Sequence, residues 1–126
     1  MKELKFYLCN HCKNLVEMIH FGGAPLMCCG EKMQLLTANT TDAATEKHVP
    51  VVSAEGGKVT VKVGSVEHPM TDAHYIQCIV LQTEKTVQRA DLLPGEKPEA
   101  VFALADGDKV VKAYAYCNLH GLWATE

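Results

Sequence analysis

The sequence contains no apolar run long enough to cross a lipid bilayer, and its first residues lack the continuous apolar stretch of a secretory signal. Its mixed charges sum to −3 and form no basic stripe, which argues against a nucleic-acid surface. It has no internal repeat, no low-complexity tract and no helical periodicity longer than two turns. These absences predict a cytoplasmic globular protein with neither a membrane nor a nucleic acid as partner.

The length and the cysteine positions indicate two domains. A chain of 126 residues suits one domain plus a small metal-bound module, and its hydrophobic fraction of 48% argues against disorder. In the reducing cytoplasm, six cysteines favour metal ligation over disulfides. Four of the cysteines lie before residue 30, and the candidate histidine ligands lie after residue 47. We therefore expect a metal-binding domain at residues 1–37 and a second domain at residues 38–126.

Beyond a polar linker at residues 38–47, the pattern is that of β-strands. Val59, Val61 and Val63 alternate with polar residues, as in a strand buried on one face. Further apolar runs, separated by glycine-containing turns, cover residues 76–81, 101–104 and 110–116. The turn at residues 106–108 is typical of a tight hairpin. The sequence thus predicts an all-β protein whose larger domain is a sandwich.

Four cysteines in the first domain have the spacing of a metal site. Cys9 and Cys12 form a Cys-x-x-Cys motif, and the adjacent Cys28 and Cys29 would complete a tetrahedron of sulfur ligands around iron or zinc. A thioredoxin-like redox pair would need a strand-to-helix context, which is missing here. A disulfide between neighbouring cysteines would be strained. Spacing alone does not decide between iron and zinc.

A second group of candidate ligands lies at the ends of the predicted strands. It consists of four histidines and one cysteine: His48, His68, His74, Cys117 and His120. Imidazole and thiolate together suit iron, copper or zinc. Two rival sites fit less well. A Rieske cluster would leave Cys12 unexplained, and a blue-copper site needs a methionine soon after its last histidine.

Three further strings complete a resemblance to a known family. The cysteine pattern resembles desulforedoxin, and the strings EKHVP (46–50), GSVEHPM (64–70) and YCNLHGLW (116–123) resemble the neelaredoxin domain. Together they resemble desulfoferrodoxin, the family of two-domain superoxide reductases, over essentially the whole chain. The resemblance implies a desulforedoxin-like module followed by an immunoglobulin-like sandwich, usually as a homodimer.

The resemblance also implies two iron ions per chain and a role for each motif residue. The four cysteines would hold the first iron, where zinc substitution is conceivable. Glu46 would be the sixth ligand of the second iron when it is ferric, and Lys47 the cation beside its open position. The second iron would take four equatorial imidazoles and one axial thiolate from His48, His68, His74, His120 and Cys117.

The implied reaction is the one-electron reduction of superoxide to hydrogen peroxide, with a rubredoxin-type protein as electron donor. Two alternatives remain open: a two-iron electron carrier without catalysis, and a zinc-stapled interaction module. The first iron could relay electrons or only stabilise its domain. We expect Trp123 to pack near the second metal, Cys78 to act as a small buried hydrophobe and His11 to be a surface residue.

Overall fold

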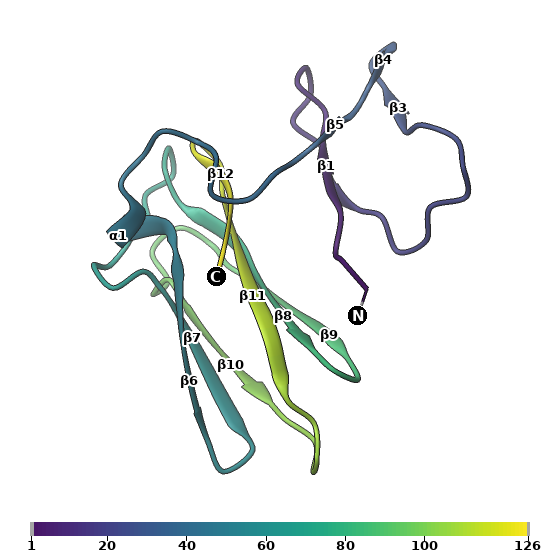
Figure 1. The fold of residues 1–126 in the computed structure, drawn as a ribbon. Coiled ribbons are helices and arrows are strands. Elements are labelled where there is room, and N and C mark those ends of the chain that lie inside the picture. Colours follow the sequence, from purple (N-terminus) through teal and green to yellow (C-terminus); the bar gives the residue numbers. More distant parts are fainter. Residues whose placement is uncertain (1, 126) are drawn as a thin grey trace. The chain divides into compact units, whose positions relative to one another are not determined.

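The computed structural model describes residues 2–125. The chain divides into two compact units, Met1–Thr37 (unit 1) and Ala38–Glu126 (unit 2). Both units are built from short or medium-length β-strands, and one turn of α-helix, α1 (Thr45–His48), is the only helix in the described part (Figure 1). Among those residues, no helix is long and apolar enough to span a membrane.

Unit 1 contains two small antiparallel sheets. One has the order β2 (Leu15–Glu17), β1 (Phe6–Leu8) and β5 (Gln34–Leu35), and the other pairs β3 (Met27–Cys28) with β4 (Glu31–Lys32). Its buried hydrophobic residues, within the described range, are Leu4, Phe6, Cys9 and Met33. A core this small cannot stabilise a fold by itself, so the unit depends on another source of free energy.

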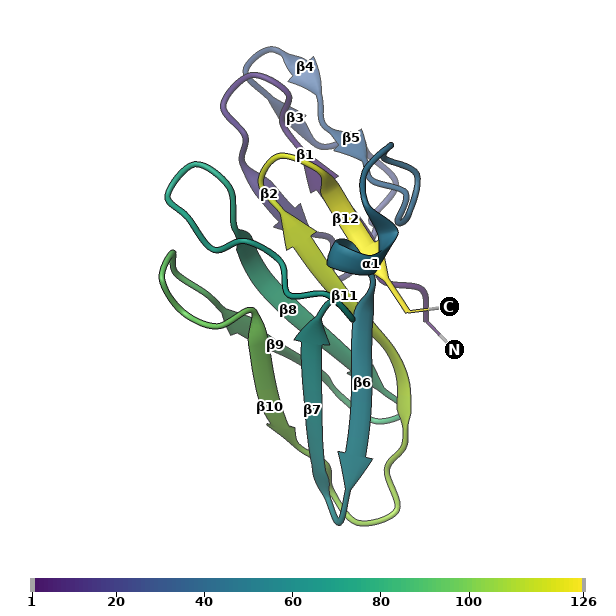
Figure 2. The same cartoon turned by 90° about the vertical axis from the view of Figure 1, so that its left-hand side faces the viewer.

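Unit 2 is a sandwich of two antiparallel sheets, visible as two layers in Figures 1 and 2. One layer has the order β10 (Glu99–Ala103), β7 (Lys58–Val63) and β6 (Pro50–Glu55). The other has the order β12 (Gly121–Ala124), β11 (Val110–Cys117), β8 (Ile76–Thr83) and β9 (Val87–Asp91). The prediction of an all-β protein with a sandwich is confirmed.

The core of unit 2 lies between these layers. Val59, Val61 and Val63 of β7 are 0–1% exposed and face the fully buried Ile79 and Leu81 of β8. The period-two alternation of β7 therefore places every second side chain in the core, as predicted. The strands β8 and β11 form the longest pairing, and Cys117 at the end of β11 belongs to the same buried cluster.

One local expectation was wrong. The turn at residues 106–108 does not close a hairpin, because β10 and β11 belong to different sheets. The Asp108 carboxylate instead accepts hydrogen bonds from the Thr83 hydroxyl at 2.6 Å and from the Lys85 N–H at 3.1 Å. These bonds anchor the turn on the β8–β9 hairpin. From this turn the chain passes from the sheet that contains β10 to the sheet that contains β11. The expected linker, in turn, ends in α1, which contains Glu46 and Lys47.

Candidate metal centres

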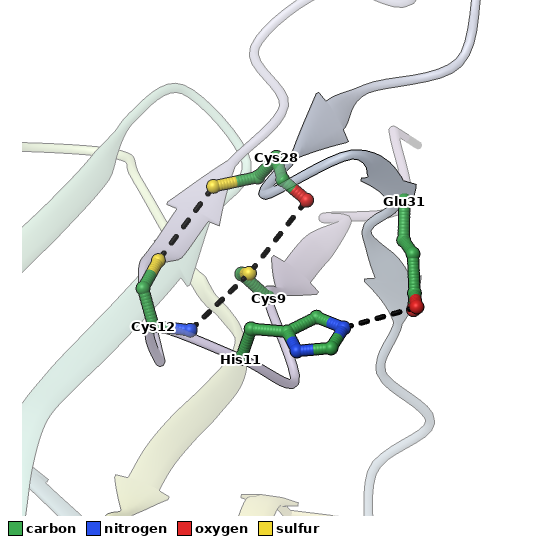
Figure 3. Close-up of polar contacts among 5 residues, drawn as sticks. All are labelled: Cys9, His11, Cys12, Cys28 and Glu31. Atoms are coloured by element: carbon green, nitrogen blue, oxygen red, sulfur yellow. Dashed lines mark hydrogen bonds and ion pairs between the residues drawn. The ribbon is translucent and has the colours of Figure 1, made fainter.

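The four cysteines of unit 1 converge on one point. Cys9 and Cys12 flank the turn after β1, and Cys28 and Cys29 lie where β3 turns into β4. Their sulfur atoms all lie within 4.8 Å of one another. Figure 3 shows three of these cysteines, and the sulfurs of Cys12 and Cys28 in it are 3.6 Å apart. Sulfurs about 2.3 Å from a tetrahedral metal would be about 3.8 Å apart. This cysteine cluster therefore has the size of a metal site.

Backbone geometry in both turns brings the sulfurs together. The N–H of Lys13 donates to the Cys9 carbonyl at 2.9 Å and closes the first turn. In the second turn Cys29 has φ +52°, a left-handed conformation that costs a non-glycine residue about 1–2 kcal/mol. Side chains of neighbouring residues in an extended strand would point to opposite faces. The left-handed turn is what allows Cys28 and Cys29 to reach the same site.

Three of the thiols in this cluster, those of Cys9, Cys28 and Cys29, have shifted pKa values. The N–H of Cys12 donates to the Cys9 sulfur and lowers the pKa of that thiol to about 6. Hydrogen bonding with Cys9 and then Cys12 raises the pKa of Cys29 to about 12, and contact with Cys12 raises that of Cys28. One thiolate forms readily, whereas further negative charge needs a cation to balance it.

His11 has a partner that its sequence context did not indicate. Its Nε2 lies 3.0 Å from a carboxylate oxygen of Glu31, so the pair joins the Cys9–Cys12 turn to β4 (Figure 3). Both side chains are more than half exposed, so the pair contributes little to stability.

The five residues of the second group come together at one end of the sandwich. His48 ends α1, His68 and His74 lie in the loop between β7 and β8, and Cys117 and His120 bracket the turn between β11 and β12. Ligand atoms of four of them, all except His68, lie within 4.8 Å of one another. His68 joins them, because its Nε2 is 3.1 Å from the Nε2 of His48. We call the five residues the histidine cluster.

The four imidazoles form a square around a common centre. Neighbouring rings are nearly perpendicular, at 76° for His48 and His68, 82° for His68 and His74, 81° for His74 and His120, and 85° for His120 and His48. His48 and His74 face each other at 6.4 Å and 29°, which leaves His68 and His120 as the other opposite pair. We call this arrangement the imidazole square.

The spacing of the nitrogens fits a metal ion. Nε2 of His48 lies 3.1 Å from Nε2 of His68 and 3.2 Å from Nδ1 of His120. For two ligands at a right angle, these separations place each nitrogen about 2.2 Å from a shared centre, close to the bond length of a metal-bound imidazole. Nε2 of His74 is buried without a hydrogen-bond partner in the described residues, as expected of an atom reserved for a metal.

Hydrogen bonds and burial prepare two of the rings as ligands. Nδ1 of His48 lies 2.7 Å from the Ala44 carbonyl, and Nδ1 of His68 lies 2.6 Å from the Pro69 carbonyl. Since a carbonyl only accepts, each Nδ1 carries the hydrogen, and each Nε2 turns its lone pair to the centre. Burial lowers the pKa of His48 and lowers that of His68 to about 4. Both rings are therefore neutral at pH 7, as ligation requires.

Cys117 and Trp123 complete the surroundings of the square. Cys117 is fully buried, and burial raises the pKa of its thiol, while the N–H groups of Leu119 and His120 act in the opposite direction. Trp123 stacks on His48 with ring centroids 4.8 Å apart and donates from Nε1 to the His120 carbonyl at 3.0 Å. The indole thus lies beside the cluster, in agreement with the prediction for Trp123.

Glu46 and Lys47 both have exposed side chains on α1. Lys47 and His68 line the same pocket of about 470 Å³. Burial is the main cause of the lowered pKa of His48 and His74, and the charge of Lys47 adds a smaller effect in the same direction. The backbone carbonyl of Glu46 accepts hydrogen bonds from the Val66 N–H at 2.8 Å and from the Ser65 hydroxyl at 3.2 Å. Both charges act on the cluster from exposed positions, because the Glu46 carboxylate raises the pKa of His48 while Lys47 lowers it.

Sequence reasoning missed two residues that organise the cluster. Gly64 lies against the backbone of Glu46 and Lys47, and Asn118 bonds to the residues on either side of His74. Both lie inside the strings that carry the family resemblance, which was the available signal. Their contacts span long distances in the sequence and could not be inferred from spacing.

Comparisons with known proteins agree with this geometry. The family model described as "Desulfoferrodoxin" matches residues 40–126, and "Desulfoferrodoxin, N-terminal domain" matches residues 1–36. A desulfoferrodoxin from Syntrophotalea carbinolica is 50% identical over 125 residues, which cover 99% of this chain and 98% of that protein.

Two solved structures extend the comparison to the fold. The crystal structure of the superoxide reductase from Treponema pallidum has a TM-score of 0.84 and 43% identity, covering 99% of this chain and 100% of its own. The superoxide reductase (1Fe-SOR) from Giardia intestinalis has a TM-score of 0.55 and 37% identity, covering 64% of this chain and 95% of its own. The resemblance seen in the sequence is confirmed, and the chain belongs to the desulfoferrodoxin family.

Proposed function

We propose that the protein is a superoxide reductase, which adds one electron and two protons to superoxide and releases hydrogen peroxide. The observation that carries the proposal is the imidazole square with the Cys117 thiol beside it, at the spacing of a metal site. The similar proteins from Treponema pallidum and Giardia intestinalis are both superoxide reductases.

The proposed ligands of the catalytic iron are the five residues of the histidine cluster. An iron ion held there would supply the electron, passing from ferrous to ferric for each superoxide reduced. The residues prepare this chemistry before any metal arrives. Carbonyl groups hold the rings of His48 and His68 in one tautomer, and burial keeps both uncharged. Burial raises the pKa of the Cys117 thiol, and the N–H groups of Leu119 and His120 partly offset that shift toward the thiolate, which is the form that binds metal.

Glu46 and Lys47 have distinct proposed roles on the same helical turn. The protein is net negative, so its global field opposes the approach of an anion. Lys47 would reverse that field locally, because its charge already acts on His48 and His74. Glu46 would be the sixth ligand of the ferric ion, which requires its exposed side chain to turn toward the cluster. Both assignments rest on the motif and on the position of α1.

Unit 1 would hold the second iron through the cysteine cluster. Its sulfur spacing suits iron and zinc equally, and iron is favoured by the family membership. We propose that residues 1–37 form this iron-binding domain and residues 38–126 the superoxide reductase domain. The match to the 1Fe-SOR from Giardia intestinalis supports this division, because it covers 64% of the chain and must include much of unit 2.

The proposal extends to the cellular setting. The cysteines of both clusters form no disulfide in the described part of the chain, which suits a reducing cytoplasm. A rubredoxin-type protein is the proposed electron donor, and a homodimer is the proposed assembly. Oxidation of reduced rubredoxin during superoxide turnover, and the mass of the protein in solution, would test these two points.

The decisive experiment mixes the iron-loaded full chain with a pulse of superoxide under anaerobic conditions. A superoxide reductase oxidises its ferrous centre in a second-order reaction and produces one hydrogen peroxide per superoxide, without oxygen. A two-iron electron carrier would exchange electrons with rubredoxin but leave superoxide to disproportionate at the background rate. A zinc module would be colourless, contain no iron and react with neither.

A further inference from the structure

The four imidazoles are held in different ways. His48 and His68 each direct Nδ1 at a backbone carbonyl, and the carbonyl of His120 accepts from the Trp123 indole at 3.0 Å. For His74 the hydrogen bonds within the described residues involve the backbone, and Nε2 is buried without a partner. The position of this ring therefore depends on how its backbone is fixed.

Asn118 fixes that backbone from both sides. Its Oδ1 accepts from the Tyr75 N–H at 2.9 Å, and its Nδ2 donates to the Ala73 carbonyl at 3.0 Å. In addition, the backbone N–H of Asn118 donates to the Tyr75 carbonyl at 3.2 Å. The amide thus spans His74, bonding to the residue before it and the residue after it.

Asn118 is close in sequence to two of the proposed ligands. Asn118 directly follows Cys117 and lies two residues before His120, so both of these proposed ligands move with it. The hydrogen bonds of the Asn118 amide therefore join the segment carrying Cys117 and His120 to the loop carrying His74. His74 and His120 are neighbours in the imidazole square, with ring centroids 5.0 Å apart.

We infer that Asn118 is a positioning residue of the histidine cluster, which sets the location of His74 relative to Cys117 and His120 through its side-chain amide. The inference rests on the proposed function, because it takes the histidine cluster to be the iron site. Removing a residue that holds a metal ligand in place by hydrogen bonds commonly lowers the affinity for the metal by about 10–100-fold. A purely structural amide would change the stability of the fold without that selective effect.

The test compares Asn118→Ala and Asn118→Asp with a matched control elsewhere in unit 2. The aspartate variant keeps the acceptor for Tyr75 and loses the donor to Ala73, and both variants keep the backbone bond to Tyr75. Asn39 provides the control, because it grips Ala124 in the same way: Nδ2 donates to the carbonyl at 3.0 Å and Oδ1 accepts from the N–H at 2.9 Å. No proposed ligand lies within the segment that Asn39 holds.

The full-length chains would be loaded with Fe²⁺ and titrated with a chelator, while absorption and electron paramagnetic resonance follow each centre. We expect both Asn118 variants to lose affinity at the histidine cluster by about 10–100-fold. The signal of the ferric form should change, and the cysteine-cluster signals should stay as in wild type. Asn39→Asp should lower the melting temperature and leave the affinity unchanged.

The possible failures are distinct. If both Asn118 variants bind Fe²⁺ at the histidine cluster as tightly as wild type, with the same ferric signal, the inference is overturned. The same conclusion follows if Asn39→Asp reduces affinity as much as Asn118→Asp. Wild-type protein that binds no iron at the histidine cluster would instead overturn the proposed function.

Discussion

The cysteine cluster and the histidine cluster lie in units that differ in the size of their hydrophobic cores. The cysteine cluster draws its four ligands from two tight turns of a unit with few buried apolar residues. The histidine cluster draws its ligands from three separate parts of a sandwich with an extensive core, in which Val59, Ile79 and Leu81 are fully buried. In unit 1 a metal would take the place of a core. In unit 2 the core exists first and holds the ligands in place.

The difference concerns what each metal stabilises. Removal of metal from unit 1 leaves four thiols, of which Cys9 has a pKa lowered by the Cys12 N–H and Cys29 a pKa raised by hydrogen bonding with Cys9 and Cys12. Removal from unit 2 leaves His48 and His68 neutral and already held by carbonyl groups, with an indole stacked on His48. We therefore expect the first site to control folding and the second to control chemistry.

The largest expected effect is on the fold of unit 1. Cys28→Ser removes one sulfur from the cysteine cluster, and structural metal sites of this kind contribute about 10–16 kcal/mol to small domains. Iron should fall from two ions to one per chain, and residues 1–37 should become sensitive to protease. Superoxide consumption with an artificial reductant should persist. Loss of that activity while unit 2 remains folded would show that the units are not independent.

The next largest effect is on the chemistry of unit 2. Cys117→Ser should abolish the thiolate-to-iron absorption of the oxidised protein and slow superoxide reduction by more than about 100-fold. That loss exceeds the about 10–100-fold expected when only a hydrogen-bond partner of a ligand is removed. The fold should survive, because the sandwich core remains. Cys78→Ser on β8 is the control and should retain both properties. The opposite pattern would mean that the wrong cysteine has been assigned as the ligand.

A smaller effect is expected at Gly64, where the backbone carrying His48 meets the loop carrying His68. A Cβ there would lie 2.6 Å from the Glu46 carbonyl oxygen and 3.0 Å from the Val49 carbonyl oxygen. Gly64→Ala must displace this backbone, so we expect a loss of about 1–3 kcal/mol in the free energy of unfolding of unit 2. Thermal denaturation would measure it.

Gly22 in unit 1 is the matched control for that substitution. A Cβ at Gly22 would meet nothing within 4 Å. Gly22→Ala should therefore leave the melting of both units unchanged. If Gly64→Ala is equally harmless, the close approach of α1 to the loop is not a constraint on the cluster.

The smallest effect is expected at Lys47 and depends on salt. Lys47→Ala should lower the second-order rate with superoxide by up to about 10-fold at low ionic strength, because local attraction of the anion is lost. The difference should shrink near 0.15 M salt, where the screening length is about 8 Å. Stopped-flow or pulse-radiolysis rates across a salt series would measure it.

Two variants sharpen that experiment. Lys47→Arg keeps the charge and should keep most of the rate. Lys58→Ala removes a lysine at the other end of the sandwich, at the start of β7, and should leave the salt dependence as in wild type. Identical rates and salt slopes for Lys47→Ala and wild type would identify Lys47 as an ordinary solvated residue.

The chemistry of both sites could be predicted from the sequence because ligand atoms are properties of residue types. Sulfur in Cys-x-x-Cys and imidazole at strand ends indicate a metal whatever the fold around them. Strand β7 was predictable for a similar reason, because burial on one face alternates with a period of two. The edge strands β6 and β9 and the short β12 were not predicted, because their residues are only partly buried or too few to show a period.

Only the tertiary structure decided how the ligands are arranged. The order of the imidazole square, with His48 opposite His74, depends on where three loops meet at the end of the sandwich. The grip of Asn118 on the backbone around His74 joins residues 43 and 45 positions apart. Residue types and spacing determine which atoms can bind a metal. Packing between segments distant in the sequence determines which of them meet, because such contacts depend on the fold rather than on local conformational preference.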